Sequence, residues 1–307
     1  MVDLSVELAP HHKSGLRLKN PVMVASGTFG YGTEYAALMD IERLGAIVSK
    51  GITWRPRTGN HQPRIVETPA GMLNSIGLQN PGVRGVIKEK APIWARWGVP
   101  VIANVAGDTY DEFCRMAELF DGVPGIAALE LNISCPNVDG GGLEFGCNPA
   151  MAEAVTRGVK AATALPVIVK LTPNMGDVPG QAQAVAAGGA DAVTVMNTLL
   201  GMVIDVRRRR PAIPRGSAGL SGPAIKPIAL HLVYQVARAV DIPIIGCGGI
   251  ATPGDALEFL MAGATAVQVG TMNFVDPQAS IKVIDGIAAH LEQGECTLSD
   301  IVGCVHR

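Results

Sequence analysis

The sequence predicts an α/β protein of the (β/α)8 TIM-barrel class, and three observations support this prediction. Eight short runs rich in apolar and β-branched residues recur along the 307-residue chain, each bounded by Gly, Pro or Asn. Segments with a helical spacing of apolar residues separate them, so strands and helices alternate. Most of the runs are almost continuously apolar, as parallel strands covered on both faces require. A doubly wound open sheet is the alternative arrangement.

The eight expected strands lie at residues 22–27, 46–51, 99–107, 127–135, 166–173, 190–198, 242–250 and 265–271. Helical spacing is clearest at 151–162 and 254–262. Gly-Ala pairs stand just before several strands, where a helix must stop and the chain turn inward. Because no linker-like or low-complexity stretch divides the chain, we expect residues 1–307 to form a single barrel domain.

Three further segments are expected to extend the barrel. Residues 3–19 alternate apolar and polar side chains and predict a hairpin that precedes the barrel and closes its bottom. Residues 52–98 and 199–241 are too long to be single crossover helices. Since both follow strands, they are expected as insertions at the C-terminal face, where barrel enzymes assemble their active sites.

Composition limits the classes of function. The net charge of −2 and the pI near 6.3 give no sign of a nucleic-acid or membrane-surface partner, and the basic run 207–210 is interpreted as a solvated loop. No long apolar run and no basic leader occur, so a soluble, cytoplasmic protein is expected. The six cysteines lack C-x-x-C spacing, which argues against a zinc site, an iron-sulfur cluster or a disulfide framework in this chain.

The C-terminal ends of the expected strands carry amides, lysines and glycines, and packing in a hydrophobic core does not account for these residue types. In a barrel all of these ends face one cavity, and a lysine buried there needs an anionic or electron-rich partner. In chain order the residues are Ser26, Lys50, Asn104, Asn132 with Cys135, Lys170, Asn197 with Thr198, Gly248 with Gly249, and Gly270 with Thr271.

Glycine-rich loops after the seventh and eighth expected strands predict a phosphate site, because glycine lets backbone N–H groups approach an anion. A phosphate at one end of the cavity, with amides and lysines around a flat polar ring at the other, matches flavin mononucleotide (FMN). Lys170 would stabilise the negative charge that reduction places on the flavin's pyrimidine end. Gly246-x-Gly248-x-x-Ala251 also fits a dinucleotide fingerprint, but it lies late in the chain instead of opening a first βαβ unit.

An uncharged stretch, residues 74–82, lies in the first long insertion and suits a small planar substrate with carbonyls and a carboxylate. Asn74, Asn132 and Asn197 together could contact the edge of such a ring, since each amide both donates and accepts. Cys135 follows an apolar strand and precedes a glycine-rich loop, so it is a candidate reactive thiol. The alternative is a buried structural cysteine at a strand end.

Seven motifs run almost from end to end of the chain: Ser26-Gly-Thr-Phe-Gly-Tyr31, Lys50-Gly51-Ile-Thr, Asn74-Ser-Ile-Gly-Leu-Gln-Asn-Pro-Gly82, Asn132-Ile-Ser-Cys-Pro-Asn137, Met196-Asn-Thr198, Gly219-Leu-Ser-Gly222 and Gly248-Gly249. Together they resemble class 1 dihydroorotate dehydrogenase, the flavoprotein of pyrimidine biosynthesis. The third motif and the glycines after Asn137 favour the catalytic subunit of the NAD-dependent class 1B enzyme over the fumarate-using class 1A enzyme. Class 2 enzymes use a serine base and a membrane helix, and the sequence has neither.

The resemblance implies a role for each motif position. Cys135 would be the general base that removes a proton from a ring carbon of (S)-dihydroorotate, while hydride leaves the adjacent carbon for the flavin. A thiol with its ordinary pKa of about 8.5 is mostly protonated at neutral pH, so activity should rise with pH. FMN would be held by Ser26, Lys50, Gly51, Asn104, Asn132, Lys170, Met196, Gly222, Gly248, Gly249, Gly270 and Thr271. The substrate would be held by Lys50, Asn74, Ser75, Ile76, Gly77, Leu78, Asn132, Asn197 and Thr198, with Asn137 as a further contact.

The resemblance also implies a partner. Class 1B enzymes pass electrons from FMN to NAD through a separate subunit with FAD and a two-iron, two-sulfur cluster, which this sequence cannot supply. A heterotetramer built on a homodimer of this chain is therefore expected. Two other classes remain open: a flavin-free phosphate-binding barrel isomerase or synthase, and a non-enzymatic binding barrel. The isomerase or synthase would not require Cys135 beside Asn132, nor both lysines.

Overall fold

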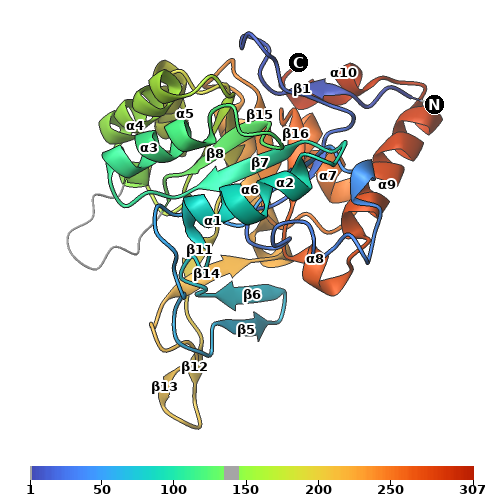
Figure 1. The fold of residues 1–307 in the computed structure, drawn as a ribbon. Helices are drawn as coiled ribbons and strands as arrows, with labels where there is room; N and C mark the ends of the chain where they lie inside the picture. Colours follow the sequence, from blue (N-terminus) through green and yellow to red (C-terminus); the bar gives the residue numbers. More distant parts are fainter. Residues whose placement is uncertain (1, 135–144) are drawn as a thin grey trace.

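A closed barrel of eight parallel strands forms the centre of the protein in the computed structural model, which describes residues 2–134 and 145–307 (Figure 1). Its strands are β3 (Val22–Val24), β4 (Ala46–Val48), β7 (Val101–Val105), β8 (Ala128–Asn132), β9 (Val167–Lys170), β10 (Ala192–Val195), β15 (Ile244–Cys247) and β16 (Ala266–Val269). Strand β16 pairs with β3 and closes the ring, so the predicted barrel is confirmed and the open sheet is wrong.

Each barrel strand lies within one of the eight expected runs, but is shorter than the run. The strands are buried along their whole length, and the last residue of β8, Asn132, is the exception. Burial on both faces is why these runs are nearly continuous in apolar residues. In seven of the eight runs, most of the extra residues lie beyond the strand's C-terminal end, where they form the loops of the barrel's C-terminal face.

Helices connect the strands and surround the barrel (Figure 1). They are α1 (Gly82–Glu89), α2 (Ala91–Trp94), α3 (Tyr110–Phe120), α4 (Pro149–Ala162), α5 (Val178–Ala187), α6 (Lys226–Val236), α7 (Pro253–Met261), α8 (Met272–Val275), α9 (Ala279–Gly294) and α10 (Leu298–Ile301), with 3-10 turns η1 (Ile41–Arg43), η2 (Phe145–Cys147), η3 (Pro223–Ile225) and η4 (Cys304–His306). The two segments with the clearest helical spacing correspond to α4 and α7. Thr109, Asn148, Asp177 and Thr252 cap the helices that follow them, because their side chains accept backbone N–H groups of the first turn. None of the helices in the described ranges combines the length and apolar character needed to cross a bilayer.

The predicted N-terminal hairpin consists of β1 (Val6–Glu7) and β2 (Arg17–Leu18), which pair antiparallel. Leu8 and Leu18 are fully buried within the core. Directly after the hairpin, the Asn20 side chain donates to the carbonyl of Arg43 in η1 at 2.8 Å. It lies at the end of the barrel opposite β5 and β6 (Figure 1), as expected for a segment that closes the bottom.

The two long insertions combine into one antiparallel sheet at the other end of the barrel (Figure 1). The first contributes β5 (Ile65–Thr68) and β6 (Gly71–Asn74), and the second contributes β11 (Leu199–Gly201) and β14 (Ala218–Ser221), in the order β11-β14-β6-β5. The hairpin of β12 (Ile204–Asp205) and β13 (Arg210–Pro211) extends beyond this sheet. The basic run forms the exposed turn and the start of β13, so its interpretation as a solvated segment is confirmed.

Candidate functional site

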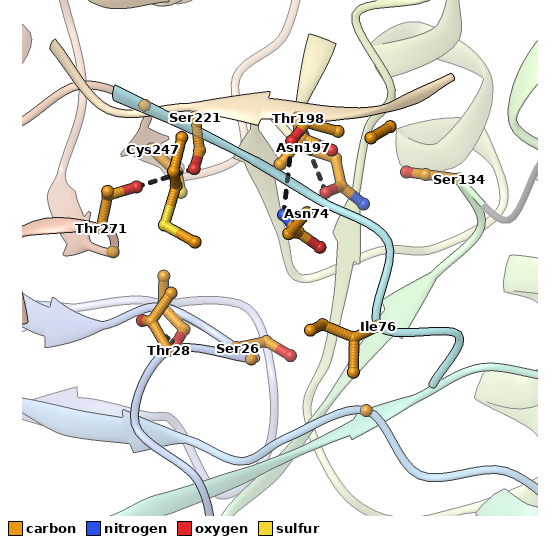
Figure 2. A pocket seen from close by; sticks show the side chains of 18 of the residues that line it. Ser26, Thr28, Asn74, Ile76, Ser134, Asn197, Thr198, Ser221, Cys247 and Thr271 are labelled. Atoms are coloured by element: carbon orange, nitrogen blue, oxygen red, sulfur yellow. Dashed lines mark hydrogen bonds between the residues drawn. The ribbon is translucent and has the colours of Figure 1, made fainter. Parts of the chain in front are cut away.

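A cavity of about 490 Å³ lies between the C-terminal ends of the barrel strands and the insertion sheet. Its lining brings together every predicted site residue in the described ranges: Ser26, Lys50, Gly51, Asn74, Ser75, Ile76, Gly77, Leu78, Asn104, Asn132, Lys170, Met196, Asn197, Thr198, Gly222, Gly248, Gly249, Gly270 and Thr271. These residues come from strand ends and from both insertions. In Figure 2, Thr271 and Ser221 lie toward one end of the cavity, and Asn197 and Ser134 lie toward the other.

The predicted thiol and its neighbour Asn137 lie outside the described residues, so their positions stay predictions. Ser134, the last residue described before Cys135, lines the cavity. Its backbone N–H donates to Asn132 Oδ1 at 3.2 Å, and its hydroxyl lies 3.4 Å from the carbonyl oxygen of Lys170. The end of β8 therefore leads the chain into the cavity wall directly before the candidate base.

A cluster of amides forms the end of the cavity where the sequence predicts the substrate. Asn197 Nδ2 donates to Asn132 Oδ1 at 3.3 Å, and Asn197 Oδ1 accepts the backbone N–H of Thr198 at 2.8 Å. Asn74 Nδ2 lies 3.4 Å from the carbonyl oxygen of Gly219 on the paired strand β14. The first contact joins the end of β8 to the segment after β10, and the last lies within the insertion sheet, between β6 and β14. The three amides can each donate to and accept from a planar polar ligand.

The loop that follows β6 is held in place by its own buried hydrogen bonds. Gly77 and Leu78 both have positive φ angles, 73° and 52°, so the backbone turns sharply there. Asn80 secures this turn, because its Nδ2 donates to the Leu78 carbonyl at 2.6 Å and to Thr53 Oγ1 at 2.7 Å. Asn80 is almost fully buried, and residues 74–78 before it form one wall of the cavity.

Glycines allow close backbone approach at the opposite end. Gly249 has φ 76°, and a Cβ atom there would lie 2.7 Å from the backbone nitrogen of Lys226. Gly222 has φ 99°, and its Cβ would lie 2.6 Å from Gly71 Cα. Only glycine fits both positions. Nearby, Thr271 Oγ1 donates to Ser221 Oγ at 2.8 Å, which adds hydroxyl groups to the predicted phosphate end (Figure 2).

The charge of the cavity favours an anionic ligand. Lys50 and Lys170 line it and Arg215 lies on its exposed rim, whereas no carboxylate is found among its described lining residues. Burial lowers the pKa of Lys50 below its ordinary value; the charge of Arg64 adds to this and Glu34 opposes it. A bound anion would therefore compensate a partly desolvated ammonium.

Lys170 is almost fully buried where it lines the cavity, and it has its own polar neighbours. Its Nζ donates to Gln268 Oε1 at 3.0 Å, and it lies 3.8 Å from Cys247 Sγ and 4.0 Å from Glu130 Oε1. Burial pulls the pKa of Lys170 down, but the Cys247 sulfur and the Glu130 carboxylate outweigh this effect and leave it above the ordinary value. The lining of the cavity thus includes an almost fully buried ammonium.

One orphaned polar atom tests whether FMN suits this cavity. Asn104 is fully buried, its Nδ2 donates to Glu130 at 2.7 Å, and its Oδ1 has no partner in the structure. Buried acceptors are usually hydrogen-bonded, so a ligand that donates to Asn104 Oδ1 would satisfy it. The oxidised flavin ring carries an N–H group that could be this donor. Together with the cationic lining and the glycine loops, this acceptor fits a planar ring that bears a phosphate.

Several lining residues were missed by the sequence analysis, including Thr28, Asn174, Ser221, Cys247 and Phe274. Asn174 had a signal, since it follows the fifth expected run, and its side chain donates to the Thr198 carbonyl at 3.0 Å. Glu130 does not line the cavity but supports it from below. A charged residue inside an otherwise apolar strand was a signal that could have identified it.

Comparisons with known proteins agree with the motifs. Residues 10–291 match the family model described as dihydroorotate dehydrogenase. The chain is 54% identical over 295 residues to the catalytic subunit of dihydroorotate dehydrogenase B (NAD(+)) of Desulforudis audaxviator, covering 96% of both chains. It is 52% identical to the corresponding subunit of Geotalea uraniireducens, over 99% of this chain and 98% of that one. The resemblance inferred from the motifs is therefore confirmed.

Proposed function

Because the chain belongs to the dihydroorotate dehydrogenase family, we propose that it oxidises (S)-dihydroorotate to orotate in pyrimidine synthesis, with FMN bound in the barrel cavity. Family membership makes it an oxidoreductase. The observation that carries the proposal is the cavity itself, which gathers the amides, both lysines and the glycine loops and has no carboxylate in its described lining.

The protein groups proposed to hold FMN fall into two sets. Gly222, Gly248, Gly249, Gly270 and Thr271 would bind the phosphate through backbone N–H groups and a hydroxyl. Ser26, Lys50, Gly51, Asn104, Asn132, Lys170 and Met196 would contact the ring and its side chain. When bound, FMN supplies the acceptor for the hydride that leaves the substrate. Lys170 would stabilise the negative charge of the reduced ring, and Asn104 Oδ1 would accept a ring N–H group.

The substrate is proposed to lie against the amide cluster and the wall from Asn74 to Leu78. Asn74, Asn132 and Asn197 would hold its carbonyl and N–H groups, with Thr198 and the backbone of the wall completing the contacts. Lys50 would pair with the anionic part of the ligand, because a half-buried ammonium gains most from an opposite charge. These contacts orient one ring face toward the proposed base.

Cys135 is proposed to act as that base, with its Sγ taking the proton from a ring carbon. The support is its position in the sequence, one residue after a side chain that lines the cavity and three after Asn132. Since the thiolate is the form that accepts a proton, the rate of substrate oxidation should rise with pH as the thiol ionises.

A second subunit is proposed to receive the electrons. The relatives are named catalytic subunits of NAD(+)-dependent enzymes, which implies a further subunit in those proteins. We propose that this chain pairs with a subunit carrying FAD and a two-iron, two-sulfur cluster, which delivers electrons to NAD, and that two of each form a heterotetramer around a homodimer of this chain.

The test is cofactor analysis and turnover of the purified chain. The protein should be yellow, with absorption near about 450 nm from oxidised flavin, and should oxidise dihydroorotate with an artificial dye as acceptor. Dihydrouracil, which lacks the carboxylate, is the matched control and should react much more slowly. A colourless protein that cannot be reconstituted with FMN would favour the flavin-free barrel enzymes. Efficient reduction of fumarate by this chain alone would favour the class 1A reaction.

A further inference from the structure

The carboxylate of Glu130 lies inside the barrel, under the cavity. Its side chain is fully buried on β8. Oε1 accepts a hydrogen bond from Asn104 Nδ2 at 2.7 Å, while Oε2 accepts from Thr194 Oγ1 at 2.9 Å and from Gln268 Nε2 at 2.6 Å. Burying a carboxylate is unfavourable unless it is paired, and this one is paired from three other strands of the ring.

This carboxylate also organises the surroundings of Lys170. Gln268 gives its Nε2 to Glu130, and this leaves its Oε1 facing Lys170 Nζ at 3.0 Å. Glu130 Oε1 itself lies 4.0 Å from the same Nζ. Glu130 therefore has two effects on the Lys170 ammonium. Its negative charge attracts the ammonium, and its hydrogen bond orients the Gln268 amide so that the amide oxygen faces the ammonium.

Two titratable groups face Lys170 in the described structure, one from each of two strands. Glu130 comes from β8 and Cys247 from β15, while the neighbours from β10 and β16, Thr194 and Gln268, are uncharged. Burial raises the pKa of the Cys247 thiol, against the opposing effect of Lys170. Glu130 is the carboxylate that faces Lys170 in the described structure, 4.0 Å from its Nζ, and Cys247 is the thiol beside it.

We propose that Glu130 is a positioning residue that keeps Lys170 protonated and directed at the cavity, so that the ring bound there always faces a positive charge. This inference rests on the proposed binding of FMN. Lys170 touches the ligand, and Glu130 acts through it. Without Glu130, burial would favour the neutral amine, and the ring would lose its cationic neighbour as the pH rises.

Sulfite binding to the flavin provides the test. Sulfite adds to the flavin ring as an anion, bleaches its absorption, and binds more tightly when a positive charge lies nearby. At low pH, Glu130→Gln should bind sulfite about as tightly as the wild type does at the same pH. Its sulfite affinity should then fall about tenfold or more as Lys170 deprotonates, because a unit charge beside the ring is lost in surroundings of low polarity.

Thr194→Val is the matched control. It removes one hydrogen bond to the same carboxylate but leaves the charge of Glu130, so its sulfite affinity should stay within about threefold of the wild type, with no new pH dependence. Equal sulfite affinities of Glu130→Gln and the wild type at every pH would overturn the proposal. If the wild-type protein binds no flavin, the proposed function fails instead, so the two failures are distinguishable.

Glu130→Gln leaves an unpaired buried ammonium and can fail to fold for that reason. The double variant Glu130→Gln/Lys170→Met then decides the question, because it removes both charges together. Its melting temperature should recover most of the loss seen in Glu130→Gln. If the double variant unfolds as readily as Glu130→Gln, Glu130 supports the barrel independently of Lys170, and the proposal is wrong.

Discussion

The single residues proposed for the site divide into those that would hold a ligand and one that would move a proton. Asn132 links the two groups, because its Oδ1 accepts from Asn197 Nδ2 and from the backbone of Ser134. The amide thus connects the proposed substrate contacts to the residue before Cys135. Lys170 and Asn104, by contrast, are buried and directed by Glu130. Binding and proton transfer should therefore be separable by mutation.

Cys135→Ala should keep the flavin spectrum but slow flavin reduction by dihydroorotate by about 10²- to 10⁴-fold, the usual contribution of a general base. Anaerobic stopped-flow absorption measures this rate. Cys304→Ala, which changes a thiol outside the cavity lining, is the control and should react as the wild type does. An unchanged rate in Cys135→Ala would mean that another group takes the proton.

The two ends of the barrel are built from different elements. The loops after β15 and β16 and the insertion sheet build the cavity, whereas the β1–β2 hairpin packs against the other end. A substitution in the loops should thus act on ligand binding, and one in the hairpin should act on stability.

Gly249→Ala should weaken FMN binding by about tenfold or more, because the added Cβ meets the backbone of Lys226 at 2.7 Å and cannot be relieved by a side-chain movement. Fluorescence titration of the apoprotein with FMN measures the affinity. Gly176→Ala is the matched control, since a Cβ there has no atom within 4 Å and the residue lies outside the cavity lining. Equal losses in both variants would show a general effect on the fold.

Leu18→Ala should lower the free energy of unfolding by about 2–5 kcal/mol, because a fully buried side chain is truncated in the hairpin. Urea unfolding measures the change. The affinity for FMN should remain within about twofold, since the hairpin lies at the opposite end of the barrel from the cavity. Leu38→Ala, which truncates a side chain that is 53% exposed, should change the stability by less than about 0.5 kcal/mol.

For the whole molecule, the proposed division of work between subunits makes a direct prediction. The chain alone should reduce an artificial dye with dihydroorotate but should not reduce NAD, because its proposed electron path ends at FMN. Addition of the proposed partner with FAD and the cluster should restore NAD reduction, measured as absorption of NADH. Reduction of NAD by the purified chain without a partner would contradict the proposed path.

The sequence by itself determined the barrel and most of the cavity. Eight runs, most of them almost continuously apolar, fit parallel strands covered on both faces, and in a barrel the residues just after them share one end of the ring. Lys170 and Asn104 were therefore assigned to the cavity from their position in a run. Neighbouring residues in the sequence are enough for this assignment, because an apolar run predicts a buried strand and the residues that follow the run mark where the strand ends.

Tertiary structure decided which inward side chains meet. Glu130 contacts Asn104, Thr194 and Gln268, which are separated from it in the chain by 26, 64 and 138 positions, respectively. The pairing of β6 with β14 likewise joins two insertions that are far apart in sequence. Such contacts depend on the stagger and closure of the ring, which a periodic pattern along one strand does not specify. The hydrogen bonds of Glu130 beneath the cavity could therefore be identified only from the closed barrel.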